Sequence, residues 1–346
     1  MGDLHLKQHN WANRPDLSGD AHESLRQVAE LCRDHDLPLI LTGDTFDSAR
    51  PSSRDVESFR QAISGLRVYI IQGQHDQSVP PWPVAILDEV EYVHNKVFEP
   101  VSGVKMFGID RQHKDKMQEA LELIPADVGI VILHQLAKQV MGLEDAWDLD
   151  LEWMPDSVHT VLIGDFHQDV SVRFGNGGQA HYSGSGHMCS IKEPIQKSCM
   201  LLQGDFSIVR HPLKTREYVM LTVGNEIQLQ ESVDIVTCMV ENAGALLPVA
   251  IARPVVVIKY LATVPEVEAR IRAAAKDFVH VWLKPSMVQS VLDLPEENAE
   301  RMSVPSLNRC LDRVVQGRTA EFVSELLLGS DTREVLGNWR GKLGIT

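Results

Sequence analysis

The sequence lacks paired cysteines and membrane-length apolar runs. Its five cysteines, at positions 32, 189, 199, 238 and 310, are scattered and form no CxxC pair. They are typical of reduced, mostly buried thiols, which favours a reducing cytoplasm. No apolar run reaches the about 20 residues that a membrane-spanning helix needs, and no signal peptide is visible. We therefore expect a cytoplasmic protein, in a bacterial or phage-infected cell, with no membrane partner.

Basic residues are also in deficit. There are 33 Lys and Arg against 48 Asp and Glu, which gives a formal net charge of −15 at pH 7. A free-standing nucleic-acid binder gains much of its affinity from Lys and Arg on phosphates, so this balance argues against that class. It does not exclude a nuclease, because metal ions bring positive charge to an acidic site and a partner subunit can supply a basic surface.

What is present is ordinary for a globular chain of 346 residues, with 44% hydrophobic and 23% charged residues. The length suits two or three domains. The first half alternates helix-like segments, at 21–36 and 52–66, with short apolar runs that end in polar residues. These runs are LPLILTGD, RVYIIQGQHD, DVGIVILHQ and HTVLIGDFHQ. We expect an α/β fold, a two-sheet sandwich flanked by helices, with its site at the strand ends.

The first polar cluster, Asp3-Leu4-His5, is an exception, because only Met1-Gly2 precedes it. Either the first strand is very short or the start is truncated relative to the native gene. We favour a missing or misassigned upstream strand.

Beyond residue 213 the sequence pattern changes to one that is typical of a small α+β unit. Strands are expected at 217–224, 226–232, 253–263 and 279–285, with a helix at 264–278. The tail is mostly helical. It carries two apolar stripes, one of Leu307, Leu311, Val314 and Val315 and one of Phe322, Val323, Leu326 and Leu327. The stripes fit either a helix-in-groove contact with a partner or packing on the chain itself.

Nine polar residues lie at the expected strand ends. They are Asp3, His5, Asp44, Gln74, His75, Asp76, His134, Asp165 and His167. Imidazole, carboxylate and amide groups suit Mn, Fe, Zn or Mg. Each cluster alone has an ordinary explanation, such as a helix cap at Asp44 or a satisfied core histidine at His134. Five clusters in order, each after a strand signal, favour a two-metal site, in which a bridging carboxylate helps to activate water at a phosphoester.

This order of motifs resembles the calcineurin-like metallophosphoesterase superfamily, with D-x-H, G-D-x-x-(D), G-N-H-(D/E), H and G-H-x-H. The resemblance covers roughly residues 1–200. The stretches DLHL, GDTFD and GQHD resemble the SbcD nuclease branch of that superfamily. Two further segments do so as well: HYSGSGHMCSIKEP at 181–194, with an acid at Glu193, and HPLKTRE at 211–217.

The resemblance implies seven metal ligands and two catalytic residues. Asp3, His5 and His167 would hold the first metal, Asp44 would bridge, and Gln74, His134 and Asp165 would serve the second metal. His75 would contact the scissile phosphate or protonate the leaving oxygen, and Asp76 would orient His75. Asp47 would support its loop and not bind metal. Two divalent ions are expected, and Mn²⁺ is favoured for them, with Mg²⁺ as the alternative.

Two positions depart from the family pattern. Gln74 stands where Asn is usual, and Asp165 stands where His is usual. Both departures fall on the second metal. A carboxylate at Asp165 makes that metal's surroundings less positive, so it favours hard ions but polarises phosphate and water less. The hypothesis is that the second site prefers Mn²⁺ or Mg²⁺ and is not abolished.

The resemblance also implies an organisation and partners. Residues 1–212 would form the metallophosphoesterase domain, 213–290 an α+β capping domain that places DNA, and 296–346 a helical segment that binds an SbcC-like SMC-family ATPase. The expected function is a DNA exonuclease or endonuclease in repair, recombination or replication, as a homodimer within a heterotetramer. Two alternatives stay open. One is a phosphodiesterase or phosphatase on small nucleotides, and the other is a catalytically weakened scaffold that recruits the ATPase.

Overall fold

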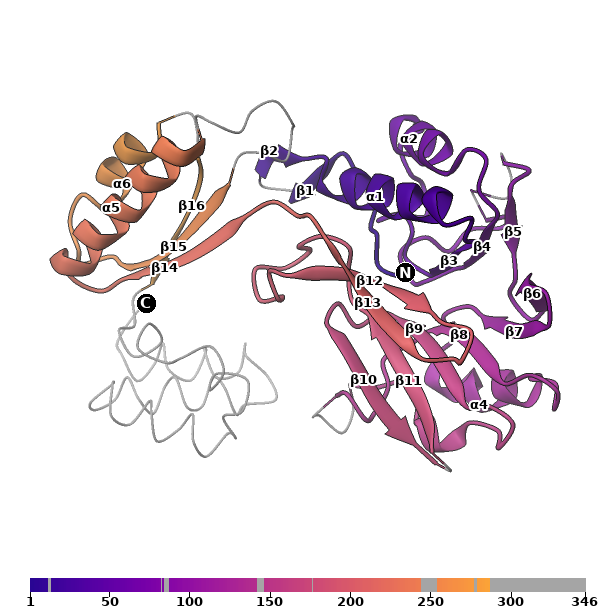
Figure 1. The fold of residues 1–346 in the computed structure, drawn as a ribbon. Coiled ribbons are helices and arrows are strands. Elements are labelled where there is room, and N and C mark those ends of the chain that lie inside the picture. The colour runs from indigo at the N-terminus through magenta and orange to yellow at the C-terminus, as the bar shows by residue number, and fades with distance from the viewer. Residues whose placement is uncertain are drawn as a thin grey trace, which may run out of the picture. The chain divides into compact units, whose positions relative to one another are not determined.

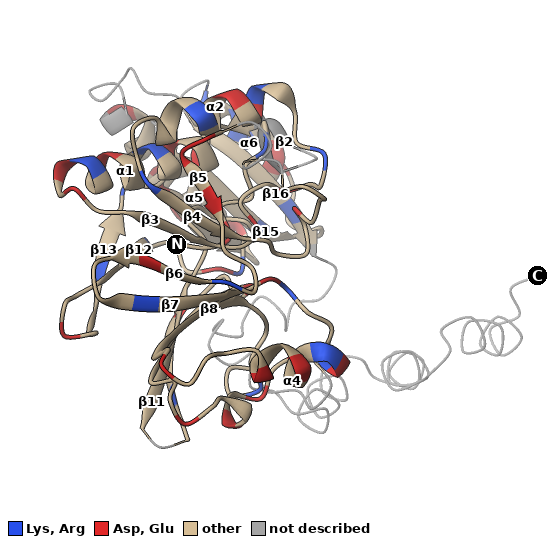
Figure 2. Cartoon of the chain, turned by 90° about the vertical axis from the view of Figure 1, so that its right-hand side faces the viewer, with Lys and Arg blue, Asp and Glu red and all other residues tan. Residues whose placement is uncertain are grey.

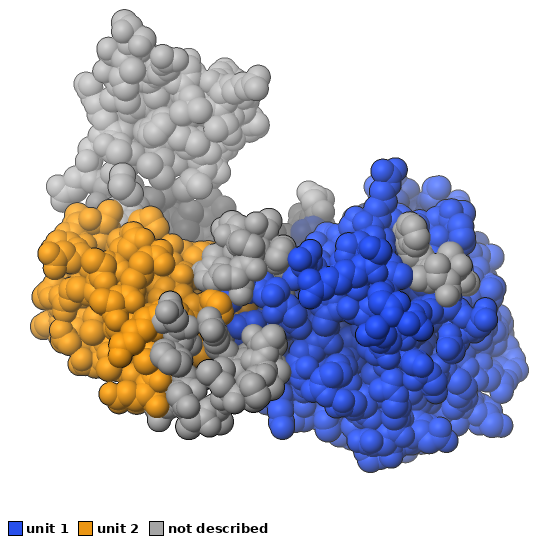
Figure 3. Space-filling view, turned by 90° about the horizontal axis from the view of Figure 1, so that it is seen from above, with its two compact units in different colours: residues 1–217, 248–252 blue, residues 218–247, 253–346 orange. Residues whose placement is uncertain are grey.

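A computed structural model describes residues 1–286, apart from 12–13, 82, 84–86, 142–145, 176, 244–253 and 277–278. The chain divides into two compact units, coloured separately in Figure 3. One unit is Met1–Glu217 with Pro248–Ala252, and the other is Tyr218–Leu247 with Arg253–Thr346. The predicted division into 1–212, 213–290 and 296–346 stays a prediction, and the last of these segments lies outside the described residues.

The first unit contains two main sheets (Figure 1). One is parallel, in the order β3 (Leu39–Thr42), β4 (Val68–Ile71) and β5 (Val90–Tyr92). The other is mixed, in the order β10 (Asp169–Phe174), β11 (Gly178–Ser183), β9 (Thr160–Gly164), β8 (Ile130–His134), β7 (Val104–Ile109) and β6 (Val97–Val101). Two antiparallel pairs accompany them, β1 (His9–Trp11) with β2 (Arg14–Ser18) and β12 (Lys197–Leu202) with β13 (Ile208–Leu213).

The two main sheets share an apolar layer. It joins Tyr69 and Ile71 of β4 to Met106 of β7, Ile132 of β8 and Leu162 of β9. Strands covered on both faces have apolar residues at nearly every position, as β3, β4 and β8 do. The predicted mixed α/β class is therefore confirmed, and the polar ends of these strands are left at the edge of the sheets.

Helices cover the outer faces of both sheets. Helix α1 (Asp20–Asp34) and helix α2 (Ser53–Ile63) share a core cluster with β3 and β4. Helix α4 (Lys114–Glu122) and a short 3₁₀ turn (Leu151–Trp153) share another with β7, β8 and β9. In Figure 2 the charged residues mark α1, α2 and α4, whereas β3, β4 and β8 carry none. This separation is the amphipathic pattern expected of helices packed on a sheet.

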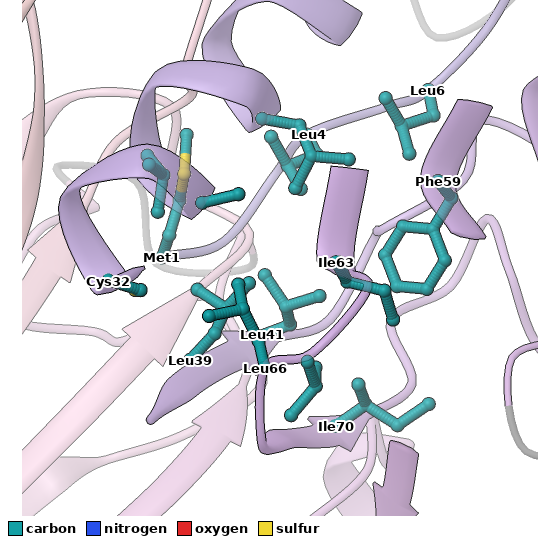
Figure 4. Packing of buried hydrophobic residues seen from close by; sticks show 14 of the residues in the cluster. Met1, Leu4, Leu6, Cys32, Leu39, Leu41, Phe59, Ile63, Leu66 and Ile70 are labelled. Atoms are coloured by element: carbon teal, nitrogen blue, oxygen red, sulfur yellow. The ribbon is translucent and has the colours of Figure 1, made fainter. Parts of the chain in front are cut away.

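The first six residues run beside β3 without forming an assigned strand. The Met1 amine donates to the Ile40 carbonyl (2.8 Å), and the Thr42 N–H donates to the Met1 carbonyl (2.9 Å). Leu4 and Leu6, both 1% exposed, point into the cluster beneath α1 and α2 (Figure 4). Asp3 and His5 face the other way: Asp3 accepts the Asp165 N–H (3.0 Å), and His5 Nε2 lies 3.2 Å from His167 Nε2.

An apolar cavity of about 240 Å³ lies next to Met1. Its lining includes Leu39 and Ile40 of β3, Cys32 of α1 and Met200 of β12. The upstream strand expected from the sequence stays a prediction.

The second unit contains a parallel sheet of β14 (Tyr218–Val223), β15 (Val255–Leu261) and β16 (His280–Ser286). Helices α5 (Glu226–Ala243) and α6 (Val267–Ala275) pack on it through one core cluster. The strand predicted at 226–232 was wrong, because this segment begins α5. Parallel neighbours need a long crossover, and Leu229, Val233 and Val236 supply its apolar helical face. Among the described helices, none is both long and apolar enough to cross a bilayer.

Candidate metal centre

Loops that follow β3, β4, β8 and β9 bring the predicted residues together. Parallel strands end at the same edge of a sheet, and here the ends of both sheets meet. The connection between the sheets is direct: His134, the last residue of β8, donates from Nδ1 to the Thr42 carbonyl of β3 (2.7 Å). Asp3 and His5 arrive from the segment that runs beside β3. We call Asp3, His5 and His167 the first half of the centre, and Gln74, His134 and Asp165 the second half.

The backbone is unusual at this edge. Asp3, His5, Asp44 and Asp165 have positive φ angles of 52°, 43°, 49° and 90°. Each left-handed non-glycine residue costs on the order of 1–3 kcal/mol, and such residues cluster at functional sites. Gly73 lets the chain approach closely, because a Cβ there would lie 2.1 Å from Asp44 Oδ1. The fold therefore holds these side chains in positions that ordinary backbone would not provide.

Asp44 lies at the centre of the cluster. Its side chain is fully buried, and Oδ1 accepts the His75 N–H (2.9 Å). Oδ2 has no hydrogen-bond partner among the described residues. Three imidazole Nε2 atoms surround Oδ2, those of His134 at 3.4 Å, His5 at 3.6 Å and His75 at 4.0 Å. A buried carboxylate oxygen left in this state is costly unless a cation reaches it.

His134 presents the matching donor atom. Its Nδ1 is committed to the Thr42 carbonyl, and its buried Nε2 has no hydrogen-bond partner among the described residues. A hydrogen bond at one ring nitrogen fixes the tautomer and leaves the lone pair of the other for a metal. The donor set around Asp44 thus fits a divalent cation.

The two histidines of the first half point at each other. His5 Nε2 and His167 Nε2 lie 3.2 Å apart. The opposite nitrogens are held by carboxylates, His5 Nδ1 by Asp47 (3.1 Å) and His167 Nδ1 by Glu193 (2.9 Å). With both Nδ1 atoms donating, two Nε2 lone pairs face one another. That arrangement repels unless a proton or a metal ion lies between them.

Asp3 and Asp165 link the two halves. Asp3 is fully buried and accepts the Asp165 N–H through Oδ1 (3.0 Å) and Oδ2 (3.1 Å). Asp3 Oδ1 also lies 3.7 Å from His167 Nε2. The Asp165 carboxylate reaches within 3.9 Å of His134 Nε2. Both carboxylates therefore border the same space between the imidazoles.

Gln74 is exposed and does not enter the buried cluster. Its Nε2 donates to Asp165 Oδ1 (2.8 Å). The two positions that depart from the family pattern therefore contact each other. In this orientation the amide oxygen of Gln74 stays available as a ligand.

The cluster attracts positive charge. Burial lowers the pKa of His134, but the nearby carboxylates of Asp44, Asp3 and Asp165 outweigh it and raise that pKa to about 10. Burial likewise opposes the charged form of His167, yet Cys189, Glu193 and Asp3 raise its pKa to about 11. A proton held this firmly occupies the position that a metal ion would take, so metal binding must release it.

His75 and Asp76 have different surroundings. The His75 side chain is 45% exposed, with its ring edge-on to His5 at a centroid distance of 4.8 Å. Asp76 is buried, and in the described structure it does not bond to His75. It accepts the N–H groups of Thr45 (2.8 Å) and Gly73 (2.9 Å), so it ties the loop after β3 to the loop after β4. Any effect of Asp76 on His75 passes through the backbone.

Sequence reasoning missed Cys189 and understated Glu193. Cys189 contributes, with His5 and His167, to one of three groups whose ligand atoms lie within 4.8 Å of one another. The other two groups are His5, Asp44 and His75, and Asp3, Asp44 and His134. The only available signal was the short spacing of Cys189 and Glu193 in HMCSIKEP. Asp44 is common to these two groups, and one of them joins Asp3 of the first half to His134 of the second.

Comparison with known proteins finds distant relatives. No protein-family profile matches the chain. Three curated proteins named DNA double-strand break repair protein Mre11 do match. The one from Sulfurisphaera tokodaii is 24% identical over 187 residues, covering 48% of this chain and 48% of the relative. The one from Methanosarcina acetivorans is 24% identical over 205 residues, covering 53% of this chain and 33% of the relative.

The third relative, from Sulfolobus acidocaldarius, is 21% identical over 271 residues, covering 70% of this chain and 68% of the relative. The chain thus spans about half or less of the length of the first two relatives. A solved structure of a hypothetical protein from Thermus thermophilus covers 56% of this chain and 93% of its own at 14% identity, with a TM-score of 0.37, which is too low to support a conclusion. The sequence matches support, at low identity, the coarse prediction of a metallophosphoesterase nuclease family.

Proposed function

We propose that this chain is the nuclease subunit of a DNA repair complex of the SbcD-like branch and hydrolyses phosphodiester bonds at a two-metal centre. The observation that carries the proposal is Asp44 Oδ2. It is buried, it has no hydrogen-bond partner among the described residues, and it faces the Nε2 atoms of His5, His75 and His134 within 4.0 Å. These surroundings suit a carboxylate that bridges two cations.

The ligand assignment follows the two halves. Asp3, His5 and His167 would hold one ion, Gln74, His134 and Asp165 the other, and Asp44 would bridge them. When bound, the ions would activate a water and neutralise charge on the phosphate. The protein's own contribution is to fix the donors: Asp47 and Glu193 hold the two imidazoles of the first half in one tautomer, and the Thr42 carbonyl holds His134.

His75 is the proposed proton donor to the leaving oxygen. Its ring is exposed at the edge of the cluster, and its backbone N–H donates to Asp44 Oδ1 (2.9 Å). An exposed imidazole on a fixed backbone can reach a substrate while the buried histidines hold the metals. Mutation of His75 should therefore lower turnover without removing metal.

The second half would favour hard ions. Asp165 brings a charge where the family pattern has a neutral ligand, and Gln74 holds one oxygen of that charge through a hydrogen bond. Carboxylate oxygen suits Mn²⁺ and Mg²⁺ better than softer ions. We expect Mn²⁺ to support the highest activity and Mg²⁺ a lower one.

DNA and an SMC-like ATPase are the proposed partners. The matched relatives are named DNA double-strand break repair protein Mre11. The net charge of −15 favours a partner that supplies DNA affinity. The capping role of the second unit, the homodimer within a heterotetramer, and the partner-binding segment 296–346 belong to the same proposal. That segment and its apolar stripes lie outside the described residues.

The test uses the purified full chain with Mn²⁺, labelled duplex and single-stranded DNA, and a small phosphodiester. The variants are His75→Ala, Asp44→Asn and, as a matched control, His35→Ala, since His35 is exposed next to the end of α1. We expect DNA cleavage that is lost in the first two variants and kept in the control. Turnover of the small ester alone would instead support a nucleotide phosphodiesterase. A chain that cleaves neither DNA nor the small ester, but binds the ATPase, would support a catalytically weakened scaffold.

A further inference from the structure

The thiol of Cys189 lies beside the first half of the centre, outside the ligand set predicted from the sequence. One ligand atom each from His5, His167 and Cys189 lies within 4.8 Å of the others. Cys189 is half-buried in the segment that joins β11 to β12. Its sulfur is therefore close enough to share a cation with the two imidazoles that already face each other.

One carboxylate positions both the thiol-bearing segment and a histidine of the first half. Glu193 Oε1 accepts from His167 Nδ1 (2.9 Å), and Glu193 Oε2 accepts the Cys189 N–H (3.1 Å). Lys197, which is 4% exposed, donates from Nζ to Glu193 Oε2 (2.7 Å) and to Ser185 Oγ (2.9 Å). A buried charge pair with further hydrogen bonds is a strongly defined geometry. Cys189 and His167 are thus held relative to each other.

A second buried imidazole contacts the sulfur. His187 is 1% exposed, and its Nε2 lies 3.6 Å from Cys189 Sγ. Its Nδ1 is buried with no hydrogen-bond partner among the described residues. The sulfur also lies 3.8 Å from the His187 carbonyl oxygen, so it contacts His187 while it stays within 4.8 Å of ligand atoms of His5 and His167.

We propose that Cys189 is a thiolate ligand of the cation held by His5 and His167. It makes the first half select thiophilic divalent ions, Zn²⁺ or Co²⁺, over Mn²⁺ and Mg²⁺. The inference rests on the proposed two-metal centre and refines it, because the second half, with Asp165, favours hard ions. On binding, the S–H bond of Cys189 breaks, its proton passes to the buffer, and a sulfur–metal bond forms without any change of oxidation state.

The chemistry follows from ligand softness. Thiolate binds zinc and related ions far better than it binds manganese or magnesium. The first half without sulfur offers two imidazoles and the Asp3 carboxylate, which suit either class of ion. Adding one thiolate decides between them. The two halves of one centre would then hold different metals.

The experiment titrates the metal-free full chain with Co²⁺ without oxygen and records its absorption. A sulfur-to-cobalt charge-transfer band in the near ultraviolet should grow together with the weaker visible bands of bound cobalt. In Cys189→Ser the charge-transfer band should be lost while the visible bands remain. The control is Cys238→Ser, because Cys238 is an exposed cysteine on α5. That variant should keep the charge-transfer band.

A competition between Zn²⁺ and Mn²⁺, read as bound metal by mass spectrometry, gives the selectivity. We expect Cys189→Ser to lower the preference for zinc by about tenfold or more, the range found for groups that tune a metal site. Protection of Cys189 from alkylation by bound zinc, measured on the unmutated chain, does not depend on the fold of any variant. Alkylation at an unchanged rate would overturn the proposal, as would a charge-transfer band that survives in Cys189→Ser.

The outcomes also separate this inference from the proposed function. Cobalt that binds with visible bands but no charge-transfer band leaves the metal centre intact and refutes the thiolate ligand. A chain that binds no cobalt, zinc or manganese refutes both. Nuclease activity that is retained, together with an unchanged preference for Zn²⁺ over Mn²⁺ in Cys189→Ser, supports the nuclease and refutes the thiolate ligand.

Discussion

The two halves of the centre are built with different degrees of constraint. In the first half both imidazoles are fixed by carboxylates, Asp47 on His5 and Glu193 on His167. In the second half only His134 is fixed, by a backbone carbonyl, while Asp165 is held by the exposed Gln74. Charge-assisted hydrogen bonds are roughly twice as strong as neutral ones, although the backbone bond of His134 is the shortest of the three at 2.7 Å. The comparison teaches that the first half sets the position of the centre and the second half is where its chemistry is tuned.

Removing Asp44, the residue that both halves share, should abolish metal binding in the two halves alike. Asp44→Asn takes the bridging charge from both, and we expect loss of detectable metal binding and of activity. In the parent, a metal ion at one hundred times its dissociation constant stabilises the native chain by about 2.7 kcal/mol. In Asp44→Asn the same concentration of metal should no longer raise the unfolding temperature. Calorimetry with and without Mn²⁺ measures this. A variant that still binds two ions would refute the bridging role.

Breaking the support of the first half should have the next largest effect. Glu193→Gln removes the charge that holds His167 and leaves Lys197 without its ionic partner. We expect metal affinity in the first half to fall by about 10–100-fold. Isothermal titration should show one weakened site and one unchanged site. The matched control Glu231→Gln, at an exposed position on α5, should change neither.

Restoring the family residue in the second half should have a smaller and selective effect. Asp165→His replaces a charged oxygen ligand with a neutral nitrogen. We expect the preference for Mn²⁺ and Mg²⁺ over Zn²⁺ in that half to fall about tenfold. Bound metal and nuclease rate, measured beside the parent, test this. An unchanged metal preference would mean that Asp165 does not act on the second metal.

The smallest effect is expected at Gln74. The variant Gln74→Ala removes one exposed hydrogen bond to Asp165 (2.8 Å). Such a bond contributes about 0.5–1.5 kcal/mol, and the exposed amide proposed as a ligand of the second metal is lost with it, so we expect metal affinity in that half to fall by about tenfold. Gln74→Asn is the matched variant, because Asn is the usual residue of the family at this position and its amide is on a shorter side chain. An effect as large as that of Glu193→Gln would show that the two halves are equally constrained.

Much of this centre was predictable because it depends on local patterns. Apolar runs that end in polar residues identified the strand ends, and the structure brings Asp3, Asp44, His134, Asp165 and His167 within a few ångströms of one another. The roles assigned to them stay predictions. The same reasoning failed at 226–232, where Ile227 and Leu229 alternate like a strand but belong to α5. A short alternating run cannot distinguish the two structures without knowledge of what covers it.

The sequence alone determined the order of strand-end clusters, the mixed α/β class and the excess of acidic residues, because each follows from residue type and local periodicity. Only the tertiary structure decided that Gln74 binds Asp165, that Asp76 ties two loops and not His75, and that Cys189 lies beside His5 and His167. The physical reason is separation along the chain. Gln74 and Asp165 are 91 residues apart, and their contact exists only once two sheets share a core.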